Sequence, residues 1–273
     1  MSTDATGTPS TEPALRAALD AFAAHARPLV ALDFDGCLAP LVDDRDAARP
    51  TPRAAAALAA LGDLPEDRRP LLALVSGRPL EPLARLASPP AGTALVGSHG
   101  AEVRLPGDDA ATAPLEEHER ALLADVTAAV RHVVATHPGT DLEPKPAGAV
   151  LHTRGADVAT ASAAARAVVD GPGRLPGVHA LRGKDVVELA VLDVDKGRSV
   201  QMLRERLGAD VVLYAGDDVT DEHALATLDP AAGDVGVKVG AGETVASFRV
   251  ADPDAVAELL EHLVRAFSSS PRG

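Results

Sequence analysis

The sequence predicts an α/β fold: a doubly wound parallel sheet forms the core, and a smaller α+β unit is inserted between its strands. Three apolar runs carry this prediction, and each of them ends in small or polar residues (28–36, 71–78 and 211–218). Uninterrupted aliphatic runs are typical of strands that helices cover on both faces. Ligands of such sheets bind beyond the carboxyl ends of the strands, so we expect the functional site where these runs end.

Helical patterns alternate with the apolar runs. Helices are predicted over 51–64 and 79–87, and a third over 195–208 leads into the last run. Alternation of strands and helices is the pattern of a doubly wound sheet. The 273 residues, 46% of them hydrophobic, are enough for a substantial core.

The middle of the chain has a different pattern. It predicts a long amphipathic helix over 115–137, a strand over 148–155, a helix over 157–171, and two short strands within 177–191 that join near Gly183. We therefore expect a separate α+β unit over 108–185. The remaining divisions are a mobile N-terminal tail, the two halves of the core and a C-terminal tail (1–13, 14–107, 186–267 and 268–273).

Charge and composition narrow the partners. The formal net charge of −14 would repel a nucleic-acid backbone or an anionic membrane, so small molecules and divalent cations are the expected partners. Only 2% of residues are aromatic and none is Trp, which disfavours a sugar platform of stacked rings and favours polar recognition.

The compartment is predicted to be the cytoplasm. Cys37 is the single cysteine, which excludes an intramolecular disulfide and a cysteine-based zinc cluster and fits a reducing environment. The first thirteen residues are acidic and polar where a secretory signal would be basic and then apolar, and no stretch approaches the length of a membrane span.

Carboxylates gather where the runs end. Asp33 and Asp35 alone could form an ordinary turn after a buried strand. Together with the acidic segment 216–222, however, they would crowd negative charge unless a cation were present, and oxygen ligands of this kind suit Mg²⁺. In such a site one Asp can act as a nucleophile on phosphorus, while a second exchanges protons with the leaving group and water.

The ordered motifs "DFDGCL", "LVSGR", "DKGRSV" and "GDDVTDE" resemble those of the haloacid dehalogenase (HAD) superfamily of phosphatases. More narrowly, "GDDVTDE", "GSHGAE", "LEPKPAGAVLHTR" and "GKDVVEL" resemble trehalose-6-phosphate phosphatases. The resemblance implies a Mg²⁺-dependent core and an inserted cap domain that selects the substrate. The inserted unit is similar to such a cap.

The resemblance also implies roles for individual residues. Asp33 would be the nucleophile and Asp35 the general acid and base, while Ser76 and Lys196 would grip the phosphoryl group. Mg²⁺ would be held by Asp33, the backbone carbonyl of Asp35 and Asp217, with Asp218 and Asp221 in support. Cys37 departs from the family pattern, in which Thr is usual, and a thiol is the weaker hydrogen-bonding group.

Substrate contacts are expected from both units. The candidates are Gly77, Arg78, His99, Glu143, Lys145, His152, Arg154, Lys184 and Glu188. Alternation along a strand puts Glu143 with Lys145, His152 with Arg154 and Lys184 with Glu188 on common faces, a polar surface able to bind a disaccharide.

Structural alternatives remain open for several of these candidates. The polar faces of the inserted unit could be ordinary solvated sheet, "SGR" a helix entry, Lys196 a surface lysine, and His99 a structural hydrogen-bonding group.

The leading hypothesis is hydrolysis of trehalose 6-phosphate to trehalose and phosphate through an aspartyl phosphate. One alternative is a related phosphatase acting on another sugar phosphate or on phosphoglycerate, which a panel of sugar phosphates would distinguish. Another is a non-catalytic sugar-phosphate sensor, which would have no need of the nucleophile. The sequence predicts neither the oligomeric state nor association with a synthase.

Overall fold

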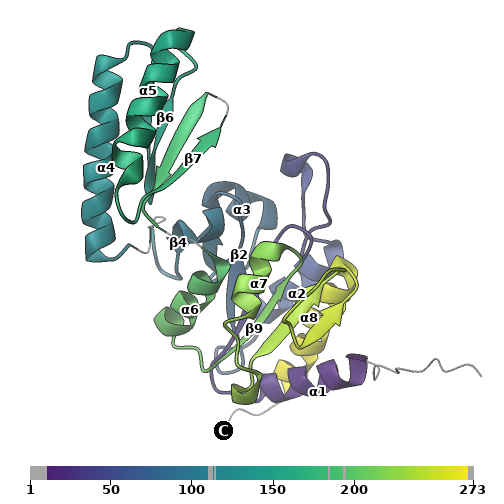
Figure 1. Ribbon diagram of the computed structural model, residues 1–273. Helices are drawn as coiled ribbons and strands as arrows, with labels where there is room; N and C mark the ends of the chain where they lie inside the picture. The colour runs from purple at the N-terminus through teal and green to yellow at the C-terminus, as the bar shows by residue number, and fades with distance from the viewer. Residues whose placement is uncertain (1–10, 110–112, 114, 184, 193–194, 270–273) are drawn as a thin grey trace, which may run out of the picture. The chain divides into compact units, whose positions relative to one another are not determined.

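The computed structural model describes residues 11–109, 113, 115–183, 185–192 and 195–269 (Figure 1). The chain divides into two compact units. The core unit comprises Met1–Ala111 and Asp195–Gly273, and the inserted unit comprises Thr112–Val194. Each unit has its own sheet and its own hydrophobic core.

The core unit is built on a seven-stranded sheet in the order β11-β10-β9-β1-β2-β3-β4. Neighbouring strands are parallel except β3 and β4, which are antiparallel. The strands are β1 (Pro28–Leu32), β2 (Leu71–Val75), β3 (Ala94–Gly97), β4 (Glu102–Arg104), β9 (Val211–Gly216), β10 (Val235–Val239) and β11 (Phe248–Val250). The predicted α/β fold with a largely parallel sheet is confirmed.

Helices cover both faces of this sheet (Figure 1). One face packs against α1 (Thr11–Ala23), α2 (Pro52–Gly62), α3 (Leu80–Ala87) and α8 (Pro253–Ser269); the other packs against α6 (Lys196–Leu207) and α7 (Val219–Leu225). The sequence of β1 is apolar throughout because both of its faces are buried. Val30 and Leu32 join one core, Leu29 and Ala31 join the other, and all four are fully buried. The short 3₁₀ helices are η1 (Arg45–Ala47), η2 (Ser98–Gly100), η3 (Pro172–Arg174) and η4 (Pro230–Ala232).

The inserted unit has a four-stranded antiparallel sheet in the order β5-β6-β8-β7. The strands are β5 (Asp141–Lys145), β6 (Gly148–His152), β7 (His179–Gly183) and β8 (Val186–Ala190), and the helices are α4 (Glu117–Thr136) and α5 (Val158–Asp170). Buried side chains such as Leu151, Val187 and Leu189 alternate along the strands and pack against both helices. One face of the sheet is therefore the core of the unit.

The opposite face of this sheet carries polar side chains. Glu143 is paired with Val150, which in turn is paired with Glu188, so these three side chains lie on one face. His152 lies two residues from Val150 and shares that face.

Four predicted boundaries were wrong. The inserted unit begins at Thr112 and not at 108. The inserted unit does not end at 185, because β8 pairs with β6 and β7 and the core resumes at Asp195. Residues 11–13 belong to α1, which buries Leu15, Leu19 and Phe22 at helical spacing. Likewise, α8 continues to Ser269. The rest of the predicted tails, 1–10 and 270–273, lies outside the described residues. Among the helices that the structure describes, none combines the length and hydropathy needed to cross a bilayer.

Candidate active site

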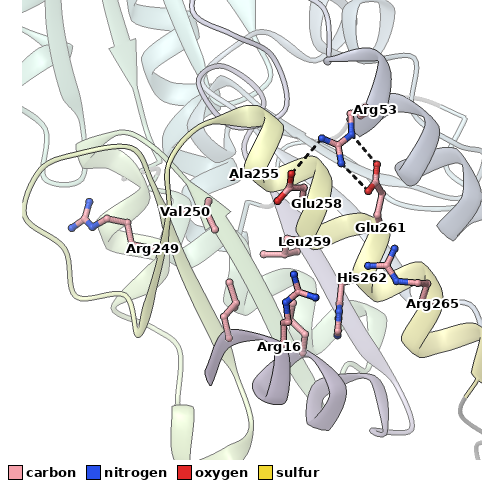
Figure 2. A pocket seen from close by; sticks show the side chains of 12 residues that line it. Arg16, Arg53, Arg249, Val250, Ala255, Glu258, Leu259, Glu261, His262 and Arg265 are labelled. Carbon is pink, nitrogen blue, oxygen red and sulfur yellow. Dashed lines mark hydrogen bonds and ion pairs between the residues drawn. The ribbon is translucent and has the colours of Figure 1, made fainter. Parts of the chain in front are cut away.

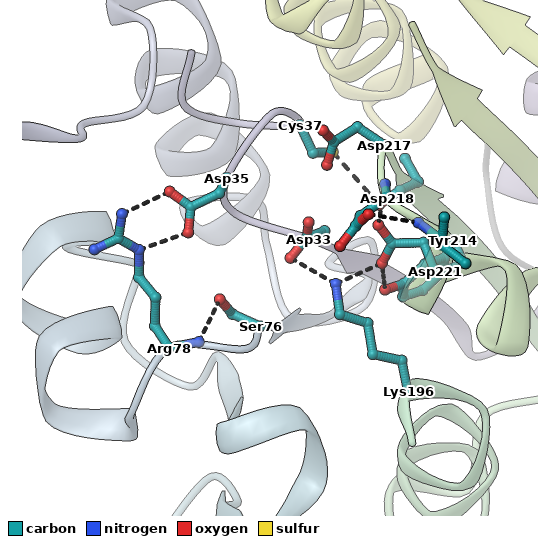
Figure 3. A network of polar contacts seen from close by, with 12 residues as sticks. Asp33, Asp35, Cys37, Ser76, Arg78, Lys196, Tyr214, Asp217, Asp218 and Asp221 are labelled. Atoms are coloured by element: carbon teal, nitrogen blue, oxygen red, sulfur yellow. Dashed lines mark hydrogen bonds and ion pairs between the residues drawn. The ribbon is translucent and has the colours of Figure 1, made fainter. Parts of the chain in front are cut away.

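Polar side chains meet at the carboxyl ends of three neighbouring strands (Figure 3). Asp33 follows β1, Ser76 follows β2 and Asp217 follows β9. In the sheet β1 lies between β2 and β9, so strands that follow β1 in the chain lie on both sides of it and the strand order changes direction there. A crevice at such a switch point is the usual ligand site of doubly wound sheets.

A buried network joins Asp33, Lys196 and Asp221. Lys196 is the first residue of α6, and its Nζ lies 3.0 Å from Asp33 Oδ1 and 2.6 Å from Asp221 Oδ1. Asp221 Oδ1 also accepts a hydrogen bond of 2.6 Å from the hydroxyl of Tyr214, and its Oδ2 accepts one of 2.9 Å from the backbone N–H of Asp218. Lys196 is 2% exposed, which rules out a surface lysine.

The charges in this network are strongly perturbed. Burial, and then the negative charge of Asp221, raise the pKa of Asp33 to about 8, although Lys196 acts in the opposite direction. Burial acts to lower the pKa of Lys196, but Asp33 and Asp221 outweigh it and raise that pKa above its ordinary value. Without a further cation the site therefore holds Lys196 charged and Asp33 protonated near neutral pH.

This shift predicts how the stability of the metal-free protein depends on pH. The raised pKa of Asp33 favours the folded state below about pH 4, and this contribution is lost as the pH rises from about 4 to about 8. In Asp33→Asn the contribution is absent. We would measure the free energy of unfolding by chemical denaturation with chelator present. The value for the variant should rise relative to that of wild type, by on the order of a few kcal/mol between about pH 4 and about pH 8.5. Parallel pH dependence of the two proteins would contradict the assignment.

Three carboxylates can approach one cation. Asp33, Asp217 and Asp221 each offer an oxygen, and these oxygens all lie within 4.8 Å of one another. Gly36 makes room for this arrangement, since a Cβ at Gly36 would lie 2.0 Å from Asp217 Oδ2 and its φ of +75° favours glycine. A compact set of carboxylate oxygens fits Mg²⁺.

Not every predicted metal ligand is equally placed. Both oxygens of Asp221 already accept hydrogen bonds, so Asp221 stands chiefly as the counter-charge of Lys196. Asp218 is exposed and caps α7, accepting a hydrogen bond of 2.7 Å from the N–H of Val219. Asp217 is left with the freer carboxylate, and burial followed by the charge of Asp221 raises its pKa.

Asp35 is held by Arg78 on the other side of the site (Figure 3). The Nε and Nη2 of Arg78 donate to the two carboxylate oxygens of Asp35, each at 2.6 Å. The guanidinium also lies 5.4 Å from the centre of the Phe34 ring. The Arg78 side chain is 6% exposed, whereas that of Asp35 is 28% exposed.

Ser76 and Gly77 in the loop after β2 contact His99, which lies in η2 after β3. The hydroxyl of the buried Ser76 accepts a hydrogen bond of 3.1 Å from the N–H of Arg78, and its carbonyl accepts one of 3.0 Å from the N–H of His99. A Cβ at Gly77 would lie 2.5 Å from the His99 ring, so the ring rests against this glycine. The His99 side chain stays exposed, and partial burial and the charge of Lys196 lower its pKa.

Cys37 is a buried thiol beside the site. Its Sγ lies 3.4 Å from the carbonyl oxygen of Ala215 and can donate to it. Burial, followed by the charge of Asp33, raises its pKa well above the ordinary value. A thiol in this state is unreactive and packs as a small hydrophobic group.

Sequence reasoning missed two residues of the site, Tyr214 and Lys238. Both lie inside apolar strands. The sequence pattern therefore predicts a core position for Tyr214 and an isolated polar position without a role for Lys238. Tyr214 is fully buried, and the Nζ of the buried Lys238 donates to the backbone carbonyl of Asp217. The one available signal was a lysine in the middle of "VGVKV", because buried lysines need a partner.

Four of the predicted sugar contacts of the inserted unit lie on its polar face, namely Glu143, Lys145, His152 and Glu188. Glu143 is paired with Lys145 at 2.5 Å and with His152 at 2.8 Å, and these bonds lower the pKa of Glu143. His152 and Arg154 line a cavity of about 310 Å³ together with Asp185 and Val186. Glu188 is half-buried on β8. Lys184 lies outside the described residues.

A cavity of about 650 Å³ between α1, β11 and α8 is separate from these carboxylates (Figure 2). Several of its charged residues have internal partners: Arg53 binds Glu258 and Glu261, Arg249 donates to the carbonyls of two glycines, and His262 lies 2.7 Å from Asp20. None of its lining residues belongs to the predicted site.

Comparison with known proteins identifies the family. A family model described as trehalose-phosphatase matches residues 31–263, a span that contains all the strand-end carboxylates, Ser76 and Lys196. The chain belongs to the trehalose-phosphatase family. The resemblance predicted from the sequence motifs is thereby confirmed.

Proteins named trehalose-phosphate phosphatase match most of the chain. A trehalose-phosphate phosphatase of Mycobacterium avium is 36% identical over 232 residues, which are 80% of this chain and 55% of that protein. One from Mycobacterium marinum is 33% identical over 259 residues, 89% of this chain and 63% of that protein. The chain thus spans little more than half the length of these relatives. A crystal structure of Aspergillus fumigatus trehalose-6-phosphate phosphatase matches with a TM-score of 0.63 at 26% identity, covering 95% of this chain and 99% of that one.

Proposed function

We propose that this protein is a Mg²⁺-dependent phosphatase that hydrolyses trehalose 6-phosphate to trehalose and phosphate through an aspartyl phosphate on Asp33. The observation that carries the proposal is the buried Asp33, held 3.0 Å from Lys196 Nζ at a strand end that also gathers Asp217. The substrate is supported by family membership and by the names of the relatives above.

In the first step an oxygen of Asp33 attacks phosphorus, and the bond between phosphorus and the sugar oxygen breaks. The hydroxyl of Ser76 and the ammonium of Lys196 hold the phosphoryl oxygens as negative charge moves onto them. Asp35 gives its proton to the departing sugar oxygen, so trehalose leaves as an alcohol. The nucleophile, phosphate clamp and acid thus come from the ends of β1 and β2 and the start of α6.

In the second step water attacks the phosphorus of the aspartyl phosphate. Asp35 accepts the proton of that water, the bond from phosphorus to Asp33 breaks, and phosphate leaves. Both carboxylates then return to their starting forms.

Asp33, Asp217 and the backbone carbonyl of Asp35 are the proposed Mg²⁺ ligands. The ion supplies positive charge that offsets the carboxylates and the dianionic phosphate. Asp221 supports the site through Lys196, and Asp218 supports it by fixing the start of α7.

We further propose that the inserted unit is a cap that binds the sugar. Its polar face carries Glu143, His152 and Glu188 in neighbouring positions of one sheet, with Lys145 beside them. Carboxylates, an ammonium and an imidazole are suited to the many hydroxyls of a disaccharide. A cytoplasmic location, supported by the single cysteine, is part of the proposal.

Glu188→Ala tests the sugar contacts. It should lower kcat/KM for trehalose 6-phosphate by about 10- to 100-fold, the scale of hydrogen bonds to a charged group, and it should lower kcat as well. A small aryl phosphate, which has no sugar, should lose far less. Arg174→Ala is the matched control, because Arg174 is an exposed member of an ion pair on the same unit. Equal losses on both substrates would make Glu188 a structural residue.

The substrate itself is tested with a panel of sugar phosphates and phosphoglycerate assayed with Mg²⁺. We expect trehalose 6-phosphate to have the highest kcat/KM by a wide margin. Comparable turnover of simple hexose phosphates would leave the reaction class standing and overturn the substrate.

A further inference from the structure

Arg78 was expected to bind substrate, but its contacts suit a different task. Its guanidinium fork is engaged with both oxygens of Asp35 at 2.6 Å, the bidentate geometry in which arginine binds carboxylates most firmly. On the basis of the proposed function, we infer that Arg78 is a positioning residue that fixes the orientation of the general acid and base Asp35.

The backbone around Arg78 is anchored on both sides. Its N–H donates to the hydroxyl of Ser76 at 3.1 Å, and its carbonyl accepts a hydrogen bond of 2.7 Å from the N–H of Ser98. The guanidinium lies over Phe34, the residue between the two catalytic carboxylates. Arg78 is therefore held in place from the β2 side and reaches across to the β1 loop.

Asp35 needs such a support. Its side chain is 28% exposed, and it lies in the loop that turns at Gly36. A partly exposed carboxylate in a loop can adopt several rotamers, and proton transfer requires one of them. Arg78 selects that one by binding both oxygens.

The pairing is compatible with both roles of Asp35. When Asp35 carries a proton on one oxygen, the other oxygen still accepts from Arg78, and the O–H can point toward the leaving group. When Asp35 is ionised, both oxygens accept from Arg78 and one retains a lone pair for the proton of water. Arg78 thus need not move between the two steps.

Leaving-group dependence separates this role from phosphate binding. A poor leaving group requires a proton from Asp35, whereas p-nitrophenolate leaves without one. Phenyl phosphate and p-nitrophenyl phosphate are close in size, so their comparison removes sugar contacts from the measurement. The relevant constant is kcat/KM, because it reports phosphoryl transfer to Asp33 and not the hydrolysis step that all substrates share.

We expect Arg78→Ala to lower kcat/KM for phenyl phosphate and trehalose 6-phosphate by about 10- to 100-fold, part of the typical worth of general acid catalysis. For p-nitrophenyl phosphate the loss should be less than about threefold. Arg78→Lys keeps the charge but not the fork, and should recover only a fraction of the loss. Asp35→Asn should give the same pattern in stronger form.

Arg53→Ala is the matched control. Arg53 makes a bidentate pair with Glu261 at 3.0 and 2.9 Å, but on the surface between α2 and α8 (Figure 2). Arg53→Ala should leave kcat/KM unchanged for all three substrates. Circular dichroism and thermal unfolding identify any variant that fails to fold, and Arg78→Lys then carries the comparison.

Equal losses of Arg78→Ala on both aryl phosphates, with a raised KM, would overturn the inference and return Arg78 to phosphate binding. No loss on either would overturn it too. If the wild type hydrolyses aryl phosphates but not trehalose 6-phosphate, the proposed substrate falls, while a split between the aryl phosphates in Arg78→Ala still supports the positioning role.

Discussion

Asp33→Asn is expected to abolish turnover, with a loss of at least about 10⁴-fold in kcat, the scale seen when a nucleophile is removed. The amide is nearly isosteric with the carboxylate but cannot form the aspartyl phosphate. The fold should persist, because Asp33 lies beyond the carboxyl end of β1 and outside the hydrophobic core. The buried network also loses a carboxyl group that is costly to ionise. Phosphate release and circular dichroism provide the two readouts.

Asp234→Asn is a suitable control for the loss of a buried aspartate. Asp234 is 4% exposed, is paired with Arg204, and accepts a hydrogen bond of 2.8 Å from the N–H of Val212. Its replacement should reduce stability while the folded molecules keep their activity. Turnover of Asp33→Asn at the wild-type rate would rule out the covalent mechanism.

Removal of divalent metal should have the second large effect. Without the metal, Asp33 would be protonated near neutral pH and therefore a poor nucleophile, and a dianionic phosphate would meet the negative charge of Asp217 while Lys196 is engaged with Asp221. We expect chelation to lower turnover by at least about 10³-fold and added Mg²⁺ to restore it. The chelator saturated with Mg²⁺ beforehand is the control.

The fold should survive this treatment. The two hydrophobic cores of the core unit contain none of the proposed ligands, so metal loss removes only the stabilisation linked to binding. Far-ultraviolet circular dichroism should therefore be unchanged, with a modest fall in the melting temperature. Full activity after exhaustive chelation would mean that the carboxylate cluster is not a metal site.

The sequence predicted those features of the site that depend on where a residue lies along a single strand. The run that ends at Asp33 is apolar because both faces of β1 are buried, and a parallel sheet brings its carboxyl end beside those of β2 and β9. The rule places Asp33, Ser76 and Asp217 at the same end of the sheet, and the strand order β9-β1-β2 brings them close together. The family motifs added roles that spacing could not supply.

Contacts between separate loops could not be predicted from the sequence. The pairing of Arg78 with Asp35 depends on how far the loop after β2 approaches the loop after β1, and no periodicity encodes that distance. Tyr214 and Lys238 were hidden because strand patterns count them as core positions. The division at 185 failed because the sequence does not show which strands β8 pairs with, and its pairing with β6 and β7 assigns it to the inserted sheet.

The division of the core unit between two chain segments has a consequence for how the protein is made. Strand β1 pairs with β9 at the centre of the sheet, and the contact from Cys37 to Ala215 joins residues 178 positions apart. A nascent chain therefore emerges with β1 and β2 but without the strand that completes their edge, whereas the inserted unit is continuous and can fold as soon as it is released. Closing so long a loop is slow. Asp33 and Asp217 consequently meet only after β9 has been synthesised and docked, so the proposed metal site cannot form before the second segment of the core has joined the first.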